Sequence, residues 1–255
     1  MSHLYEEKYN NQGSPMKIVE CLEGGKIIVE FQDNYKFRVS SIYGNFKSGS
    51  IKNPFHPSIY GVGITGNKYP RSINCKMTKE YDTWIHILQR CFNENLKTKQ
   101  PSYKDKECCD EWLYYPNFYE WLHSQSNFNK WYNGKRWAID KDILVKSNKT
   151  YSPDACCLIP QNVNCLFLKR EAERGIYPIG VRYKDDDGFL ASCHNPFTNR
   201  KEELGSYSTP ENAFQAYKVY KEGIIKQVAE IEYKNGNITK ECYEAMNNYE
   251  VEIDD

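Results

Sequence analysis

Cysteine is the residue type in this sequence with the widest choice of chemistry, because two thiols can form a disulfide and three or four thiolates can hold zinc. The 255-residue chain has ten scattered cysteines, with adjacent pairs at Cys108–Cys109 and Cys156–Cys157. Adjacent cysteines rarely bond to each other, and no two are separated by the two residues typical of zinc ribbons. The sequence therefore predicts neither a disulfide framework nor a zinc ribbon.

Lysine and arginine offer a second chemistry, the binding of phosphate. The formal net charge is zero, but six acidic residues and no Lys or Arg follow Lys240. The first 240 residues therefore carry a net charge of +6, and residues 68–106 hold nine Lys and Arg against four acidic residues. This distribution permits phosphate contacts. The 21 tyrosines could stack on bases, although an AT-rich genome also explains an excess of Tyr, Asn and Lys.

Hydrophobic spacing indicates the elements that must position these groups. Residues 1–15 are polar and are expected to be a flexible N-terminus. Short β-type runs separated by turn residues follow, which predicts a small β-rich domain at 16–77. Thr78 can cap a helix whose apolar side chains recur at i, i+3 and i+4. Further helices are expected to begin at Pro116 and Pro160.

The C-terminal part has the clearest pattern. Strands are expected at 179–183, 189–194 and 201–207, and Thr209-Pro210-Glu211 opens a long helix with an apolar stripe from Phe214 to Ile231. Together they predict a three-stranded antiparallel sheet packed on one helix. We interpret the acidic tail that follows, 241–255, as a solubilising end.

This module resembles the Apetala-type DNA-binding domain, the ethylene-response-factor fold of plants, which also occurs in phage and homing-endonuclease proteins. The matching residues are Gly180-Val181-Arg182-Tyr183, Phe189-Leu190-Ala191-Ser192, Leu204-Gly205-Ser206-Tyr207 and the helix start from Thr209 to Tyr217. The resemblance implies that the sheet lies in the major groove of double-stranded DNA. By position, it implies that phosphates or base edges are contacted by Arg182, Tyr183, Lys184 and Arg200. A small αβ protein-interaction module is the alternative.

A second segment, 78–168, resembles HNH-type endonucleases of phages. The shared skeleton is Tyr81, Trp84, Arg90-Cys91, Cys109-Asp110-Glu111-Trp112, Asn117-Phe118, Trp121, Ile139-Asp140-Lys141-Asp142, Tyr151-Ser152-Pro153-Asp154-Ala155-Cys156, Asn162 and Asn164. The resemblance implies a ββα nuclease core, with hairpin arms near 136–145 and 156–159. Three cysteines in family-like positions could form a structural zinc site if a fourth ligand joined them, although small apolar packing is the alternative reading: Cys91, Cys109 and Cys156.

The HNH-like segment departs from the working pattern, because no histidine occurs between His123 and His194 to act as general base. Asp140 stands roughly in its place, which predicts catalytic roles for Asp140, Asp142 and Asn148. Oxygen ligands for Mg²⁺ or Mn²⁺ would come from Asp140, Asn162 and Asn164. Since an ordinary Asp has a pKa of about 3.9, catalysis would require a raised pKa or a metal-bound hydroxide.

The sequence thus predicts an α+β, modular protein with a flexible N-terminus (1–15), a small β-rich domain (16–77), a helix-rich HNH-like central domain (78–174), an Apetala-like domain (175–240) and an acidic tail (241–255). The favoured function is a phage-type double-stranded DNA-binding protein with a degenerate HNH-like module. A metal-dependent, homing-like DNA endonuclease is the alternative, and a phage protein that binds a host protein is a third. No segment approaches the ~20 apolar residues of a membrane span, and no signal peptide is evident, so we expect it in the bacterial host cytoplasm.

Overall fold

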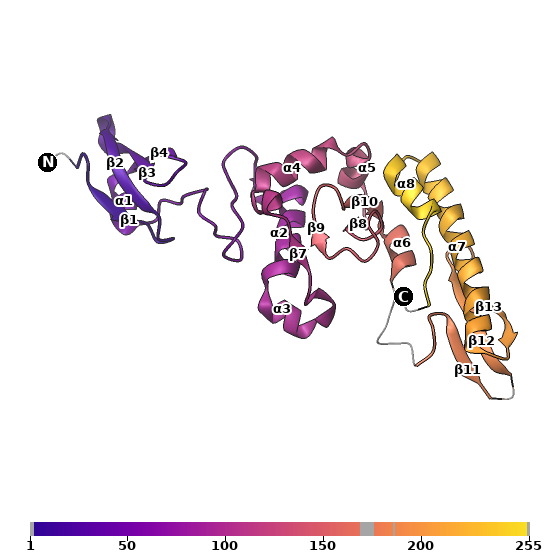
Figure 1. The fold of residues 1–255 in the computed structure, drawn as a ribbon. Helices are drawn as coiled ribbons and strands as arrows, with labels where there is room; N and C mark the ends of the chain where they lie inside the picture. Colours follow the sequence, from indigo (N-terminus) through magenta and orange to yellow (C-terminus); the bar gives the residue numbers. More distant parts are fainter. Residues whose placement is uncertain (1–2, 169–175, 186, 254–255) are drawn as a thin grey trace. The chain divides into compact units, whose positions relative to one another are not determined.

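The computed structural model describes residues 3–168, 176–185 and 187–253, and it contains two compact units, Met1–Leu122 and His123–Asp255 (Figure 1). Helices and antiparallel sheets occur in both units, in agreement with the predicted α+β class. Several predicted features involve residues outside the described ones: the first two residues, the boundary at 174/175, Asp186 in the first turn of the C-terminal sheet, and Asp254 and Asp255 of the tail.

The first unit begins with a four-stranded antiparallel sheet in the order β1-β2-β3-β4, formed by Glu7–Tyr9, Pro15–Cys21, Lys26–Phe31 and Arg38–Ile42. Alternate side chains of β2 and β3 form its core, since a strand presents every second residue to one face. The fully buried members include Met16, Ile18, Val29 and Phe31. The structure differs from the sequence prediction at the N-terminus, because β1 lies within the segment expected to be flexible. A short helix, α1 (Tyr43–Ser48), follows β4 directly.

The remainder of the first unit is mainly helical. Its elements are β5 (Ser72–Ile73), β6 (Lys76–Met77), α2 (Lys79–Phe92), α3 (Glu94–Lys99), η2 (Pro101–Tyr103), β7 (Glu107–Cys108), η3 (Asp110–Leu113) and the start of α4 (Tyr115–Ser124); η1 (Glu23–Gly25) precedes them. Thr78 caps α2 as predicted, because its hydroxyl accepts a hydrogen bond from the Tyr81 N–H at 3.3 Å. The Trp84 indole donates to the Trp112 carbonyl at 2.7 Å, and both rings are fully buried.

The second unit contains a ββα element at the position expected from the HNH resemblance. Strands β8 (Trp137–Asp140) and β10 (Cys157–Pro160) pair antiparallel and overlap the predicted arms, with Pro160 one residue beyond the second arm; Cys157 lies opposite Asp140. The helix that follows starts at the predicted proline: Pro160 precedes α6 (Gln161–Asn164), which continues as η4 (Cys165–Phe167). The unit also holds α5 (Phe128–Asn133) and β9 (Thr150–Tyr151).

The predicted C-terminal sheet and helix are confirmed. Strands β11 (Val181–Lys184), β12 (Gly188–Asn195) and β13 (Arg200–Tyr207) form an antiparallel sheet in that order, and α7 (Pro210–Lys234) packs on one of its faces. The Thr209 hydroxyl caps α7 by accepting from the Asn212 N–H at 3.2 Å, with Pro210 in the first turn. The sequence pattern therefore located the ends of each strand to within two residues.

The segment interpreted as an acidic solubilising tail is instead part of the core. It contains α8 (Lys240–Asn247), which packs against α7, and the side chains of Cys242 and Met246 are fully buried. One continuous hydrophobic core joins this segment to the ββα element and to α7; its members include Cys157, Ile159, Phe214, Ile225, Met246 and Val251. The Asn127 amide adds a polar link, because it donates to the carbonyls of Leu158 and Asn237 at 2.9 Å each.

Within the described part of the chain, no helix is long and apolar enough to cross a membrane.

Candidate nucleic-acid interface

The sheet β11–β13 has one face toward α7 and one face away from it. Val181, Cys193 and Leu204 belong to the core that α7 completes, so they mark the covered face. Directly paired residues of neighbouring strands lie on the same face, and successive residues alternate. The pairing then assigns the following residues to the other face, which we call the open face: Arg182, Lys184, Leu190, Ser192, His194, Lys201, Glu203 and Ser206. Of these, Leu190 and Ser192 are buried.

A register shift keeps both faces consistent along the sheet. Pairing is interrupted between Ala191 and Ser192, where β13 has one extra residue, Leu204. Such a bulge lets a strand accommodate an extra residue and increases its twist. Beyond it, Ser192 lies opposite Glu203 and His194 lies opposite Lys201. The bulge therefore keeps Lys201 and Glu203, in the first half of β13, on the open face.

The open face carries more basic than acidic side chains, and two of its basic groups are ion-paired. Arg182 Nη2 lies 3.0 Å from Glu203 Oε1, with both side chains more than half exposed. Lys184 Nζ lies 2.5 Å from Asp187 in the turn between β11 and β12. Exposed ion pairs of this kind contribute little stability. Since they are also easily exchanged for other partners, both cations are available to an anionic ligand.

The four residues predicted to contact DNA are divided between the two faces. Arg182 and Lys184 lie on the open face, whereas Tyr183 alternates to the covered face, where its ring contacts Tyr177 and Phe189. Arg200 lies opposite Asn195, whose amide donates to the Tyr220 hydroxyl of α7. The structure thus brings together half of the predicted set.

Sequence reasoning missed the exposed residues His194 and Lys201 on the open face. The signal that could have found them is the two-residue period of β12 and β13. Counting alternate positions from Arg182 would have separated Tyr183 from its neighbours. It would also have included the basic side chains on the second half of β12 and on β13.

The predicted catalytic residues lie at the end of β8 and in the loop that follows it. Asp140 is buried, and its Oδ1 accepts from the backbone N–H groups of Asp142 and Ile143 at 2.9 Å each. Burial, followed by the charge of Asp142, raises the pKa of Asp140 to about 6. The raised pKa that a catalytic aspartate would need is therefore present, while one carboxylate oxygen already stabilises the turn.

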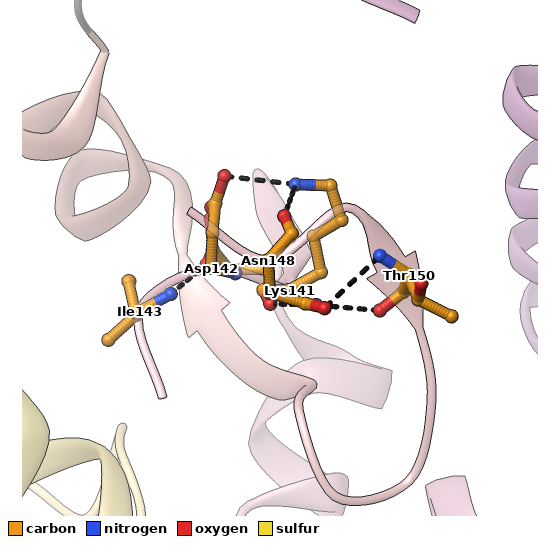
Figure 2. Close-up of polar contacts among 6 residues, drawn as sticks. Lys141, Asp142, Ile143, Asn148 and Thr150 are labelled. Carbon is orange, nitrogen blue, oxygen red and sulfur yellow. Dashed lines mark hydrogen bonds and ion pairs between the residues drawn. The ribbon is translucent and has the colours of Figure 1, made fainter. Parts of the chain in front are cut away.

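Lys141 occupies the centre of this loop (Figure 2). Its ammonium donates to Asp142 Oδ2 at 2.9 Å and to the Asn148 carbonyl at 2.7 Å, and the residue is only 5% exposed. The Asn148 side chain is also engaged, because its amide donates to the carbonyls of Lys141 and Thr150 at 2.7 Å each. Asp142 and Asn148 therefore lie close together, and both accept hydrogen bonds from Lys141 of the same loop.

A cation of the chain itself already occupies this loop, because Lys141 Nζ lies 2.9 Å from Asp142 Oδ2. A metal ion bound to Asp142 would lie beside the ammonium of Lys141, and like charges at such distances repel strongly in a buried setting. Asn162 donates to Glu232 Oε1 at 2.9 Å, so its amide is directed to α7; Asn164 ends α6. Among the residues that the structure describes, no group of three or more His, Cys, Asp or Glu could hold a metal ion.

The cysteines of the zinc hypothesis are divided between the two units. Cys91 is buried on α2, and Cys109 directly precedes η3, both in the first unit. Burial raises the pKa of the Cys109 thiol, which disfavours the thiolate that zinc requires. Cys156 is buried in the second unit. Zinc binding by these three residues stays a prediction.

The raised pKa of Asp140 predicts a pH-dependent effect of Asp140→Asn. An unfolded aspartate titrates near pH 4, so between about pH 4 and pH 6 the folded chain binds more protons and loses stability as pH rises. Asparagine keeps an oxygen for the two backbone donors and carries no charge. We expect Asp140→Asn to stabilise the protein by about 1–3 kcal/mol at pH 8 and by much less at pH 4.5.

Urea unfolding at the two pH values measures this difference, with the exposed Asp154→Asn as the matched control. A loss of stability at pH 8, or the same change at both pH values, would contradict the account of Asp140 as a buried carboxylate.

Comparison with known proteins supports one part of this picture. No family model matches the chain, and no solved structure matches it. The chain is 35% identical over 69 residues to the ethylene-responsive transcription factor ERF116 of Arabidopsis thaliana. That stretch is 26% of this chain and 24% of the relative, so the chain spans about a quarter of the length of the curated protein it matches. Part of the chain is thus similar to part of an ethylene-responsive transcription factor.

Proposed function

We propose that this protein is a phage-type double-stranded DNA-binding protein that reads DNA with the open face of β11–β13. The observation that carries the proposal is the gathering of Arg182, Lys184 and Lys201 on the sheet face that α7 leaves uncovered. A small β-sheet fits the major groove, and arginine can pair with guanine through two hydrogen bonds. The similarity to a transcription factor over 69 residues supports the same use.

Binding to a duplex, measured by fluorescence anisotropy between 50 and 200 mM salt, tests this proposal. Affinity should fall steeply with salt, because phosphate contacts release counterions. Arg182→Ala should weaken binding by about 1–3 kcal/mol and, if Arg182 contacts phosphate, reduce the salt slope by about one. Lys226→Ala is the matched control, since Lys226 is exposed on α7 away from the open face. Binding that ignores salt, or is unchanged by Arg182→Ala, would contradict it.

Glu203→Gln should have the opposite effect and strengthen DNA binding. The Glu203 carboxylate lies 3.0 Å from Arg182 and competes with phosphate for its guanidinium. Glutamine removes that competition and one negative charge from the open face, while the side-chain shape is kept. We expect a gain in affinity of about twofold to tenfold at 50 mM salt, decreasing at 200 mM as ions screen the surface. Unchanged or weaker binding would place the DNA elsewhere.

A metal-dependent, homing-like endonuclease is the second candidate, favoured by the ββα order of β8, β10 and α6 and by the raised pKa of Asp140. Supercoiled plasmid incubated with Mg²⁺, Mn²⁺ or chelator tests it. Nicking that requires metal and disappears in Asp140→Ala would support an HNH-like nuclease. A mobility shift without nicking would make the ββα element a degenerate scaffold. The absence of both nicking and a shift would favour a host protein as the partner.

A further inference from the structure

A cavity of about 690 Å³ adjoins the second half of β12. β11 pairs with β12 only as far as Ala191, so from Ser192 onward β12 has no neighbouring strand on that side among the described residues. Apolar walls come from Leu166, Leu168 and Ile179, while Lys201 and Lys221 add two cationic groups. This volume is within the range of sites that hold small organic ligands.

Lys221 is the unusual member of this cavity. It lies on α7 one turn after Tyr217, so both side chains are on the same side of the helix. Burial lowers the pKa of its ammonium, and the charge of the Cys193 thiolate would oppose this shift. Lys221 forms no hydrogen bond or ion pair with the described residues, and the described lining contains no Asp or Glu. A largely buried ammonium without a partner is costly, and an anion would offset that cost.

We infer that this cavity binds the phosphate group of a nucleotide, with Lys221 on the phosphate and the apolar wall beside the sugar and base. Asn199 also lines the cavity and supplies an amide group for a further hydrogen bond. The space exceeds what a bare phosphate fills, which favours an organic phosphate. The choice of a nucleotide rests on the proposed function, since Ser192, His194 and Lys201 belong both to the cavity and to the open face.

Titration calorimetry with deoxyadenosine monophosphate tests the inference on the full chain. Wild-type protein should bind it more tightly than inorganic phosphate. Lys221→Met should weaken binding about tenfold or more, since it removes a charged hydrogen bond, and Lys221→Arg should recover part of the loss. Lys226→Met is the matched control on the same helix and should bind as wild type. Absence of binding, or equal affinity of wild type and Lys221→Met, overturns the inference.

A second pair of ligands distinguishes the sources of the phosphate. If a 5′-phosphorylated single strand binds more tightly than the same strand without phosphate and displaces the mononucleotide, the cavity holds a strand end. If the two strands bind alike, the ligand is a free nucleotide. Arg182→Ala separates this site from the open face: it should weaken duplex binding and leave mononucleotide affinity unchanged. Duplex binding by this variant therefore tests the proposed function, and mononucleotide binding separately tests whether the cavity holds a nucleotide.

The fold of the variant is checked independently. Lys221→Met replaces a poorly solvated charge by an apolar chain of similar length, so its urea midpoint should equal or exceed that of wild type. Acylation of lysines followed by peptide mass analysis gives a second readout on wild-type protein. The mononucleotide should protect Lys221 and leave Lys226 reactive; equal labelling of Lys221 with and without ligand would contradict the site.

Discussion

A chain that ends at Thr239 is expected to lose the cooperative unfolding transition of the unit His123–Asp255. The deletion removes α8 and Val251, and with them Cys242 and Met246, which are fully buried in the shared core. It also removes the Val251 carbonyl, which accepts from Lys218 Nζ at 2.7 Å. The loss of each larger buried side chain costs about 2–5 kcal/mol. Losing several of them would remove most of a typical free energy of unfolding of about 5–15 kcal/mol.

Single substitutions in α8 make this expectation quantitative. Met246→Ala should cost about 2–5 kcal/mol in urea unfolding, because it leaves a cavity between α8 and α7. Glu244→Ala on the exposed side of the same helix should change stability by less than about 0.5 kcal/mol. If the truncated chain unfolded at the wild-type urea midpoint, the segment would be the dispensable acidic tail that its composition suggests.

Gly180→Ala is expected to have the second large effect. Gly180 has a φ of +79°, in the left-handed region, and an added Cβ would lie 2.1 Å from the Tyr217 ring. Tyr217 is buried in the core under the sheet, so the ring has little room to move. The Gly180 carbonyl also accepts from the Ser192 N–H at 2.9 Å and holds the start of β11 against β12.

Strain in φ and overpacking each cost about 1–3 kcal/mol, so Gly180→Ala should destabilise the protein by about 2–5 kcal/mol. Thermal and urea unfolding measure this loss. Gly223→Ala is the matched control, because an added Cβ there meets nothing within 4 Å, and alanine favours a helix interior by about 1 kcal/mol. A variant Gly180→Ala as stable as wild type would mean that the segment before β11 adopts another conformation in solution.

Sequence patterns predicted the elements of the C-terminal sheet and α7 because local signals agree there. Strand residues alternate, Thr209 caps the helix, and Pro210 stands in its first turn. The faces of the sheet were not predicted. The four DNA-contacting residues were transferred from the family by position, and this transfer ignored the alternation of side chains along a strand, which places Tyr183 and Arg182 on opposite faces. The bulge at Ala191/Ser192 depends on pairing with β13 and has no local signal.

Composition was misleading at the C-terminus. Six acidic residues in fifteen indicate a solvated tail. However, Cys242 and Met246 are four residues apart, so they form an apolar face on a short helix, and Val251 extends this apolar surface beyond the end of the helix. The loop after β8 shows a similar limit. Asp140, Asp142 and Asn148 have the types expected of a metal site, but only the fold reveals that Lys141 occupies the space between two of their oxygens.

The continuous core of the second unit has a consequence for protein engineering. A fragment that starts at 176 and ends at Lys234 contains the whole sheet and α7 and resembles an independent domain. Excising it would remove the residues of β10, α6 and α8 that pack against Phe214, Ile225 and Val228. If this fragment were fused to another protein, it would expose an apolar surface that promotes self-association. The natural unit of exchange is therefore the whole of His123–Asp255, and shuffling between related chains should succeed at crossover points near residue 122 and fail near residue 175.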